Sequence, residues 1–166
     1  ASTSVTMGAH TSLSCFPIVN FGSEEQKEKF LPLLASGKYL GAFALTEPNA
    51  GSDAANQQTT AVKDGDEYVL NGNKIFITNG GVADYITVAC MTDKKLGYKG
   101  ISLFIVEPKK IKGFKVGTKE DKLGLRGSNT SEIVFEDMRL PAENMIGKEG
   151  QGFKIAMGVF DSGRIG

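Results

Sequence analysis

Residues 63–81 read KDGDEYVLNGNKIFITNGG, and they contain the densest series of strand and turn signals in the chain. Within them, two short apolar runs, Tyr68-Val69-Leu70 and Ile75-Phe76-Ile77, lie between polar turn residues, and such runs of aromatic and β-branched residues are typical of strands. Asp-Gly and Asn-Gly pairs supply the positive φ of tight hairpin turns. The stretch therefore predicts two short strands between turns: strands at 66–70 and 73–78, and turns at Asp64-Gly65, Asn71-Gly72 and Asn79-Gly80-Gly81.

The same pattern continues on both sides of this stretch. The chain has 21 glycines among 166 residues, and they fall between short apolar runs and not in a repeat. Eight short strands with no long helix between them favour an antiparallel β-barrel or sandwich. The six further candidate strands are 40–46, 57–63, 84–91, 100–107, 113–118 and 130–136.

Both ends of the chain are expected to be helical. Residues 1–38 predict a helix broken at Phe16-Pro17 and a second helix, which starts at a capping box over 23–26 and ends at Gly37. Over 147–166, the apolar residues repeat at helical spacing. A helix this short cannot bury its apolar face alone, so we expect a fragment whose ends belong to neighbouring domains.

Composition excludes several classes of protein. Hydrophobic residues make up 40% of the chain, and 19 Lys and Arg balance 19 Asp and Glu, so neither nucleic acid nor a membrane surface is an expected partner. No apolar run is long enough to span a bilayer. The single His10 argues against a metal site, and we interpret it as structural. Cys15 and Cys90 are expected to pack as small apolar residues. Their number and spacing do not suit a disulfide framework, so a reducing compartment is expected.

Two clusters could carry chemistry. FALTEPNAGSD (43–53) runs from a strand into a loop of small residues, which could offer backbone N–H groups and a Ser hydroxyl to a phosphate, or could be an ordinary turn. KIFITNGG (74–81) places Phe76 and Thr78 on one face of a strand. An aromatic ring beside a hydroxyl could hold a flat heteroaromatic ring, although a core Phe before a turn has the same pattern.

Together these clusters resemble the acyl-CoA dehydrogenase family. The resemblance continues through 119–166, where the run KEDKLGLRGSNT (119–130) is most similar to the short-chain (butyryl-CoA) branch. It implies a flavoenzyme with a helical N-terminal domain, a middle β domain and a C-terminal helical bundle. By that resemblance, residues 1–38 end the first domain, 39–146 form the second, and 147–166 begin the third.

The resemblance implies an activity and partners. Family members oxidise the Cα–Cβ bond of an acyl-CoA to a trans-2-enoyl-CoA, transfer the hydride to FAD and pass electrons to an electron-transferring flavoprotein. The expected substrate is a short-chain acyl-CoA, and relatives are usually homotetramers. Bacterial cytoplasm and mitochondrial matrix are both compatible locations, and secretion is not expected.

The resemblance also implies site residues. Phe76 is expected to stack on the flavin ring, where relatives most often have Trp, and Thr78 to donate a hydrogen bond to flavin N5. Ser52 is expected beside the FAD pyrophosphate and the thioester arm of CoA, and Asp161 and Arg164 are expected to contact acyl-CoA. The implied cofactor-binding residues are Phe43, Ala44, Leu45, Thr46, Gly51, Ser52, Phe76, Ile77 and Thr78.

No residue of this chain is expected to be the catalytic base. Glu47 lies in the turn, and Glu120 and Asp121 lie in a charged stretch expected to be solvated. In some branches of the family the base Glu directly precedes the Arg that Arg164 matches, but here that position is Gly163. We therefore expect the base downstream of residue 166 and an isolated chain without activity. Arg126 could meet a phosphate, orient its loop or form a structural ion pair.

Three hypotheses follow. The first is a fragment of an FAD-dependent short-chain acyl-CoA dehydrogenase. The second keeps the fold but changes the electron acceptor or the direction, as in an acyl-CoA oxidase or an enoyl-CoA reductase. The third is a non-catalytic β module that only binds flavin or acyl-CoA, or serves as a scaffold.

Overall fold

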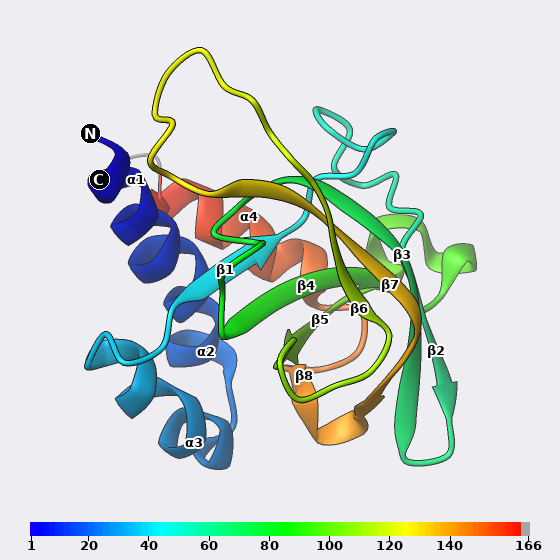
Figure 1. Cartoon of the computed structure of the whole chain (residues 1–166). Helices are drawn as coiled ribbons and strands as arrows, with labels where there is room; N and C mark the ends of the chain where they lie inside the picture. The colour runs from blue at the N-terminus through cyan, green and yellow to red at the C-terminus, as the bar shows by residue number, and fades with distance from the viewer. Residues whose placement is uncertain (164–166) are drawn as a thin grey trace.

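A mixed eight-stranded sheet forms the centre of the computed structural model, which describes the backbone of residues 1–163 and the side chains of 1–161 (Figure 1). The main path of the sheet is β6-β7-β3-β2-β4-β5-β8, and β1 pairs with β4. The strands are β1 Gly41–Ala44, β2 Thr60–Asp64, β3 Glu67–Thr78, β4 Tyr85–Met91, β5 Ile101–Val106, β6 Phe114–Lys119, β7 Thr130–Pro141 and β8 Met145–Ile146.

The predicted mainly β fold with flanking helices is confirmed, but the sheet is mixed and open and is not a closed antiparallel barrel. Strand β1 runs parallel to β4, and β2 meets β4 in a parallel pairing as well. The N–H groups of Asp84 and Tyr85 both donate to the carbonyl of Leu40. The start of β4 therefore lies beside the start of β1, and the two strands run in the same direction. Among the described residues, the outer strands β6 and β8 do not pair with each other, so the sheet stays open.

The turn predictions have mixed outcomes. Asp64-Gly65 does connect a hairpin, β2–β3, with φ +62° at Gly65. Asn71-Gly72 does not turn the chain, because β3 continues unbroken to Thr78. Gly72 has φ +140°, and a Cβ atom there would lie 2.7 Å from the Thr59 Cα, so this glycine serves a close backbone approach at a register shift. The turn at 79–81 is confirmed, with φ +66° at Asn79.

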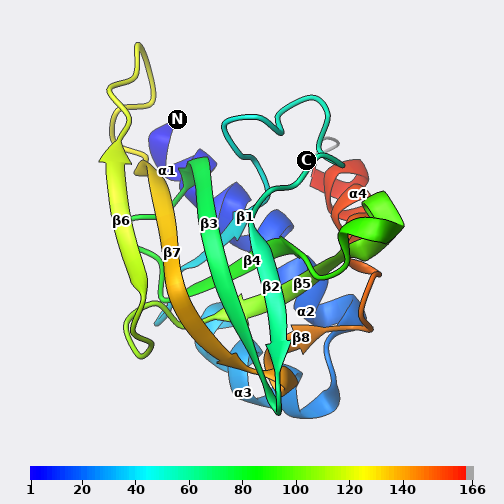
Figure 2. The ribbon, with the colours of Figure 1, turned by 90° about the vertical axis from the view of Figure 1, so that its right-hand side faces the viewer.

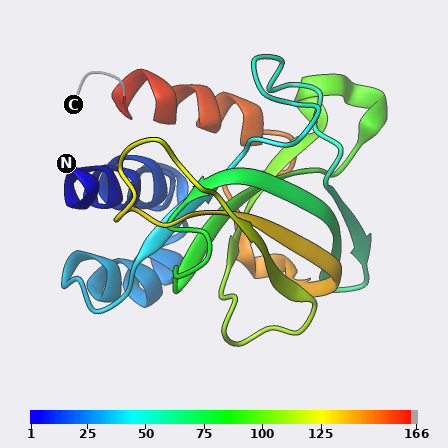
Figure 3. The same cartoon turned by 45° about the horizontal axis from the view of Figure 1, so that its top comes forward.

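The helices cover one side of the sheet (Figure 2). Segments η1 and α2 lie between α3 and α4 (Figure 3). The helical segments are α1 Ser2–Gly8, the π-helix η1 Ala9–Cys15, α2 Phe16–Phe21, α3 Glu24–Ala35, α4 Gly152–Gly163 and the short 3₁₀ segments η2 Lys94–Gly100 and η3 Ala142–Asn144. No helix among the described residues is long and apolar enough to cross a membrane.

The break predicted at Phe16-Pro17 is wrong. The chain stays helical from Ser2 to Phe21, and Pro17 is the second residue of α2, directly after the π-helix η1. The predicted capping box is confirmed: Ser23 accepts from the Gln26 N–H, and the Gln26 side chain accepts from the Ser23 N–H. Helix α3 ends at Ala35, and Gly37 follows it with φ +70°.

Strand β4 separates two apolar clusters and is buried along its whole length. Ile86, Val88 and Cys90 face the cluster inside the curved sheet, which includes Phe104 and Phe135. The alternate side chains of β4 face the cluster beneath the helices. Each fully buried large apolar side chain contributes about 1.5–3 kcal/mol to folding, so the helices and the sheet stabilise each other through this strand.

Candidate functional site

Six of the nine predicted cofactor-binding residues line one small cavity of about 130 Å³. Strand β1 and the residues after it supply one wall, the end of β3 supplies another, and η1 and α4 close the sides. The lining residues are Ala9, Leu13, Phe43, Leu45, Thr46, Phe76, Ile77, Thr78 and Phe160. The structure therefore brings together residues about 30 positions apart, as the resemblance implies.

Phe76 is exposed beside this cavity because β3 carries an extra residue. Lys74 pairs with Ile133 and Ile77 pairs with Ser131, so β3 advances three residues while β7 advances two. Lys74 and Ile77 both face inward, and Phe76 between them has φ +58° and a side chain that is 59% exposed. A bulky residue at positive φ costs about 1–3 kcal/mol and persists only where its surroundings impose it. The bulge thus holds an aromatic face open to solvent.

Two threonine hydroxyls border the same cavity. Thr46 and Thr78 are both half-buried, and within the described part of the chain neither hydroxyl has a hydrogen-bond partner. The backbone at this point is fixed, since the Ile75 N–H donates to the Thr46 carbonyl at 2.9 Å. The cavity therefore combines an exposed aromatic ring, apolar side chains and two free hydroxyls, the groups that contact the face and the polar edges of a flat heteroaromatic ring.

Sequence reasoning missed a buried ion pair beneath this site. The Lys74 Nζ lies 2.7 Å from Glu47 Oε1, and both side chains are almost completely shielded from water. Glu47 also accepts from the N–H groups of Gln58 (2.6 Å) and Thr59 (3.0 Å). The signal in the sequence was a lysine at an inward-facing position of an apolar strand, which requires a partner.

The pKa values of this pair follow from burial and mutual attraction. Burial raises the pKa of Glu47, but Lys74 and the hydrogen bonds from its neighbours outweigh burial and hold it below its usual range. Burial lowers the pKa of Lys74, and Glu47 opposes that shift. Glu47 is therefore a carboxylate whose acceptor sites are occupied, and it is not free to take a proton from a substrate.

The remaining predicted residues lie elsewhere. Ala44 is completely buried in the core of the sheet, and Gly51 and Ser52 are exposed in the loop after β1. Asp161 is exposed on α4, and Arg164 lies outside the described residues. Arg126 is exposed and donates to the Lys122 carbonyl of its own loop, and it forms no ion pair within the described part of the chain.

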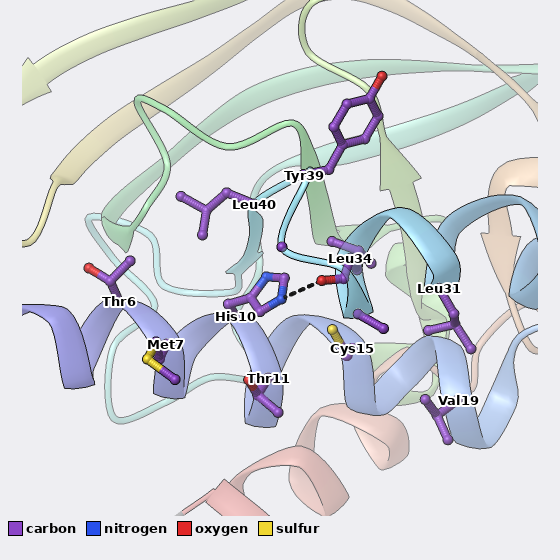
Figure 4. A pocket seen from close by; sticks show the side chains of 12 residues that line it. Thr6, Met7, His10, Thr11, Cys15, Val19, Leu31, Leu34, Tyr39 and Leu40 are labelled. Atoms are coloured by element: carbon purple, nitrogen blue, oxygen red, sulfur yellow. Dashed lines mark hydrogen bonds between the residues drawn. The ribbon is translucent and has the colours of Figure 1, made fainter.

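A larger apolar pocket of about 560 Å³ lies between η1 and α3 and was not predicted (Figure 4). His10 is on its wall and is structural, as expected: its Nδ1 accepts from the Gly41 N–H at 2.9 Å, and its Nε2 lies 3.2 Å from the Leu34 carbonyl. These two contacts hold the imidazole ring between β1 and α3. His10 thereby ties β1 to the helical layer.

The two cysteines are both free thiols. Cys90 is completely buried, and burial raises its pKa to about 12. Cys15 is half-buried, and burial raises its pKa as well. Both serve as small apolar residues, as predicted, since a protonated thiol in such surroundings is inert.

Comparison with known proteins agrees with this geometry. The family model of the acyl-CoA dehydrogenase middle domain matches residues 42–138, and that of the N-terminal domain matches residues 1–38. The short-chain specific acyl-CoA dehydrogenase of Clostridium acetobutylicum is 60% identical over 99% of this chain and 43% of its own length. The acryloyl-CoA reductase (NADH) of Anaerotignum propionicum is 54% identical over 90% of this chain and 38% of its own length.

The fold is also that of solved relatives. The butyryl-CoA dehydrogenase of Megasphaera elsdenii superposes with a TM-score of 0.96 at 56% identity, covering 99% of this chain and 43% of that one. This chain thus spans about two-fifths of the length of the curated relatives it matches. The mixed sheet with its flanking helices is the middle-domain fold that the motifs implied. The chain belongs to the acyl-CoA dehydrogenase family.

Proposed function

We propose that this chain is the flavin-binding and acyl-CoA-binding middle of an FAD-dependent dehydrogenase that oxidises short-chain acyl-CoA to trans-2-enoyl-CoA. The observation that carries the proposal is the exposed Phe76 beside the free hydroxyls of Thr46 and Thr78. An enzyme without an aromatic ligand would gain nothing from a phenylalanine held open at positive φ. The high identity to short-chain dehydrogenases supports the same assignment.

Each residue at the cavity has a proposed task. Phe76 stacks on the flavin ring, and the Thr78 hydroxyl donates a hydrogen bond at flavin N5. Leu45 and Thr46 bind the pyrimidine end of the ring, with Phe43, Ala44 and Ile77 supporting them. Gly51 and Ser52 belong to the loop proposed for the pyrophosphate, and Ser52, Asp161 and Arg164 are proposed to contact acyl-CoA.

FAD, when bound, supplies the acceptor for a hydride from the substrate β-carbon. The protein must provide a base for the α-proton, and Glu47 cannot, because Lys74 and two backbone N–H groups occupy its carboxylate. As the family resemblance implies, the base is proposed to be a Glu outside this chain. An electron-transferring flavoprotein is the proposed electron acceptor, a homotetramer the proposed assembly, and bacterial cytoplasm or mitochondrial matrix the proposed location.

The test uses the full-length protein. We expect it to purify with bound flavin and its flavin absorbance to bleach when butyryl-CoA is added without oxygen. Reoxidation should be fast with an electron-transferring flavoprotein and slow with oxygen. A protein without flavin would overturn the proposal. Fast reoxidation by oxygen would identify an oxidase, and flavin that butyryl-CoA does not reduce would favour a non-catalytic binding module.

A second candidate is an enoyl-CoA reductase with the same fold. The acryloyl-CoA reductase named above is 54% identical, so the two directions of the reaction share this middle domain. The same preparation distinguishes them. Rapid reduction of the flavin by NADH, followed by reoxidation with acryloyl-CoA, would favour the reductase. Reduction by butyryl-CoA alone would favour the dehydrogenase.

A further inference from the structure

We propose that the buried pair Glu47–Lys74 holds the segment around Thr46 in a fixed position relative to the bulge at Phe76. The pair thereby determines how tightly the flavin binds. This role rests on the proposed function, because it concerns the same cavity. Neither residue lines that cavity, so neither is proposed to touch the cofactor. The pair would act only through the residues that it holds in place.

The contacts of Lys74 all lead to one segment. Its Nζ donates to the carbonyl of Leu45 at 3.2 Å, to Oε1 of Glu47 at 2.7 Å and to Oε1 of Gln57. An ammonium group has three donors, and here all three are used. A single side chain of β3 is therefore bonded to the residues on both sides of Thr46 and to the far end of the loop that follows β1.

Glu47 fixes the other end of that loop. Its carboxylate accepts from the N–H groups of Gln58 and Thr59, just before β2. The backbone of Glu47 also pairs in both directions with that of Ala50, at 3.2 and 3.1 Å. The loop between β1 and β2, which lies beside the end of β3, is thus fixed at both ends (Figure 2). Ser52 lies within the part that these bonds enclose.

Lys74 also fixes the bulge. Regular alternation after an inward-facing Lys74 would turn Phe76 inward, and only the extra residue between Lys74 and Ile77 turns it outward. Lys74 cannot rotate outward without leaving the buried Glu47 carboxylate with no opposite charge beside it. The ion pair therefore opposes the slip of one residue that would exchange the faces of β3, and it keeps Phe76 available for stacking.

The experiment measures flavin affinity and flavin environment in the full-length protein. We expect Lys74→Met to weaken binding of FAD to the apoprotein at least about tenfold and to change the visible circular dichroism of the bound flavin, because a site that is too loose loses its geometry. Glu47→Gln is the second variant. It preserves side-chain size but places an NH₂ group among hydrogen-bond donors, so it should also weaken FAD binding. It replaces Lys74→Met in the test if that variant does not fold.

Two comparisons separate positioning from simple stability. The control is Lys115→Met, which removes the exposed pair Lys115–Glu136 from the same sheet and should leave both flavin readouts unchanged. The double variant of Lys74 and Glu47 should lose no more affinity than the worse single variant, because the two residues act as one unit. Apoprotein melting temperatures are measured in parallel.

The outcomes are distinct. Variants that melt earlier yet bind FAD with wild-type affinity and circular dichroism would overturn the positioning role and leave the proposed function standing. Additive losses in the double variant would also contradict it. A wild-type protein that binds no flavin would overturn the proposed function, and the positioning role with it.

Discussion

Removing the ring of Phe76 tests the assignment of the cavity most directly. The side chain is 59% exposed, so Phe76→Ala takes little from the folded core, and we expect the free energy of unfolding of the apoprotein to change by less than about 1 kcal/mol. If the exposed ring is the platform for a flavin, the same change should weaken FAD binding strongly. Phe76→Ala is therefore expected to lower the affinity for FAD without lowering the stability of the apoprotein to a comparable extent.

The size of the loss follows from the exposed area. A phenylalanine side chain presents about 200 Å², of which about 120 Å² is exposed here, and a planar ligand covers about half of that. At about 25 cal/mol per Å², the 60 Å² or so that is covered is equivalent to about 1.5 kcal/mol. Stacking geometry adds about 0.5–1.5 kcal/mol. A total of about 2–3 kcal/mol corresponds to FAD binding that is roughly 30- to 140-fold weaker.

The assay is titration of the full-length apoprotein with FAD, followed by flavin fluorescence. Phe76→Trp retains an aromatic face and should bind FAD at least as tightly as the wild type. Val62→Ala is the control, because Val62 is 60% exposed on β2 and does not line the cavity. If Phe76→Ala binds FAD within threefold of the wild type, Phe76 is not a stacking platform and the area argument fails.

Three further predictions concern stability, each checked by urea unfolding. Gly72→Ala should lower the free energy of unfolding by about 2–4 kcal/mol, since Cβ would meet the Thr59 backbone at φ +140°; Gly8→Ala, with no atom near the new methyl group, should not destabilise the protein. Burial raises the pKa of Cys90 from 9.0 to about 12, so the unfolded chain releases this proton first and stability should fall as pH rises from 9 to 12; the fall should be shallower in Cys90→Ala, and an equal slope would contradict this. His10→Leu should cost about 1–3 kcal/mol, because the Gly41 N–H loses its acceptor, whereas Thr11→Ala on the exposed side of the same helix should be nearly neutral.

Most of the strand prediction was correct because it depended on local signals. The run at 84–91 and the hairpin at Asp64-Gly65 are visible in the sequence as apolar residues and a turn pair. Asn71-Gly72 has an equally good turn signal, yet β3 passes through it. There the approach of Thr59, a contact from outside the local sequence, requires the glycine. The two pairs differ in tertiary context and not in local preference.

The candidate site was predicted through motifs and not through geometry. FALTEPNAGSD and KIFITNGG indicated the two segments, and six of their residues do line one cavity. Simple alternation placed Phe76 and Thr78 on one face but gave no reason for the exposure of Phe76. The bulge supplies that reason, and it depends on pairing between β3 and β7. Lys74 was part of the quoted motif, but its role was missed because its partner lies 27 positions away.

From the sequence alone come the family, the approximate limits of most strands, the capped helix α3 and the two segments of the candidate site. These features depend on residue types, on periodicity and on interactions within a few positions. Two predicted strands, 66–70 and 73–78, are one strand in the structure, and β8 was not predicted. Four features are visible only in the folded chain: β1 runs parallel to β4, the sheet stays open among the described residues, Phe76 faces outward, and Glu47 pairs with Lys74. Each of these depends on contacts between segments far apart in the chain, and such contacts form only when burial and hydrogen bonding bring the segments together.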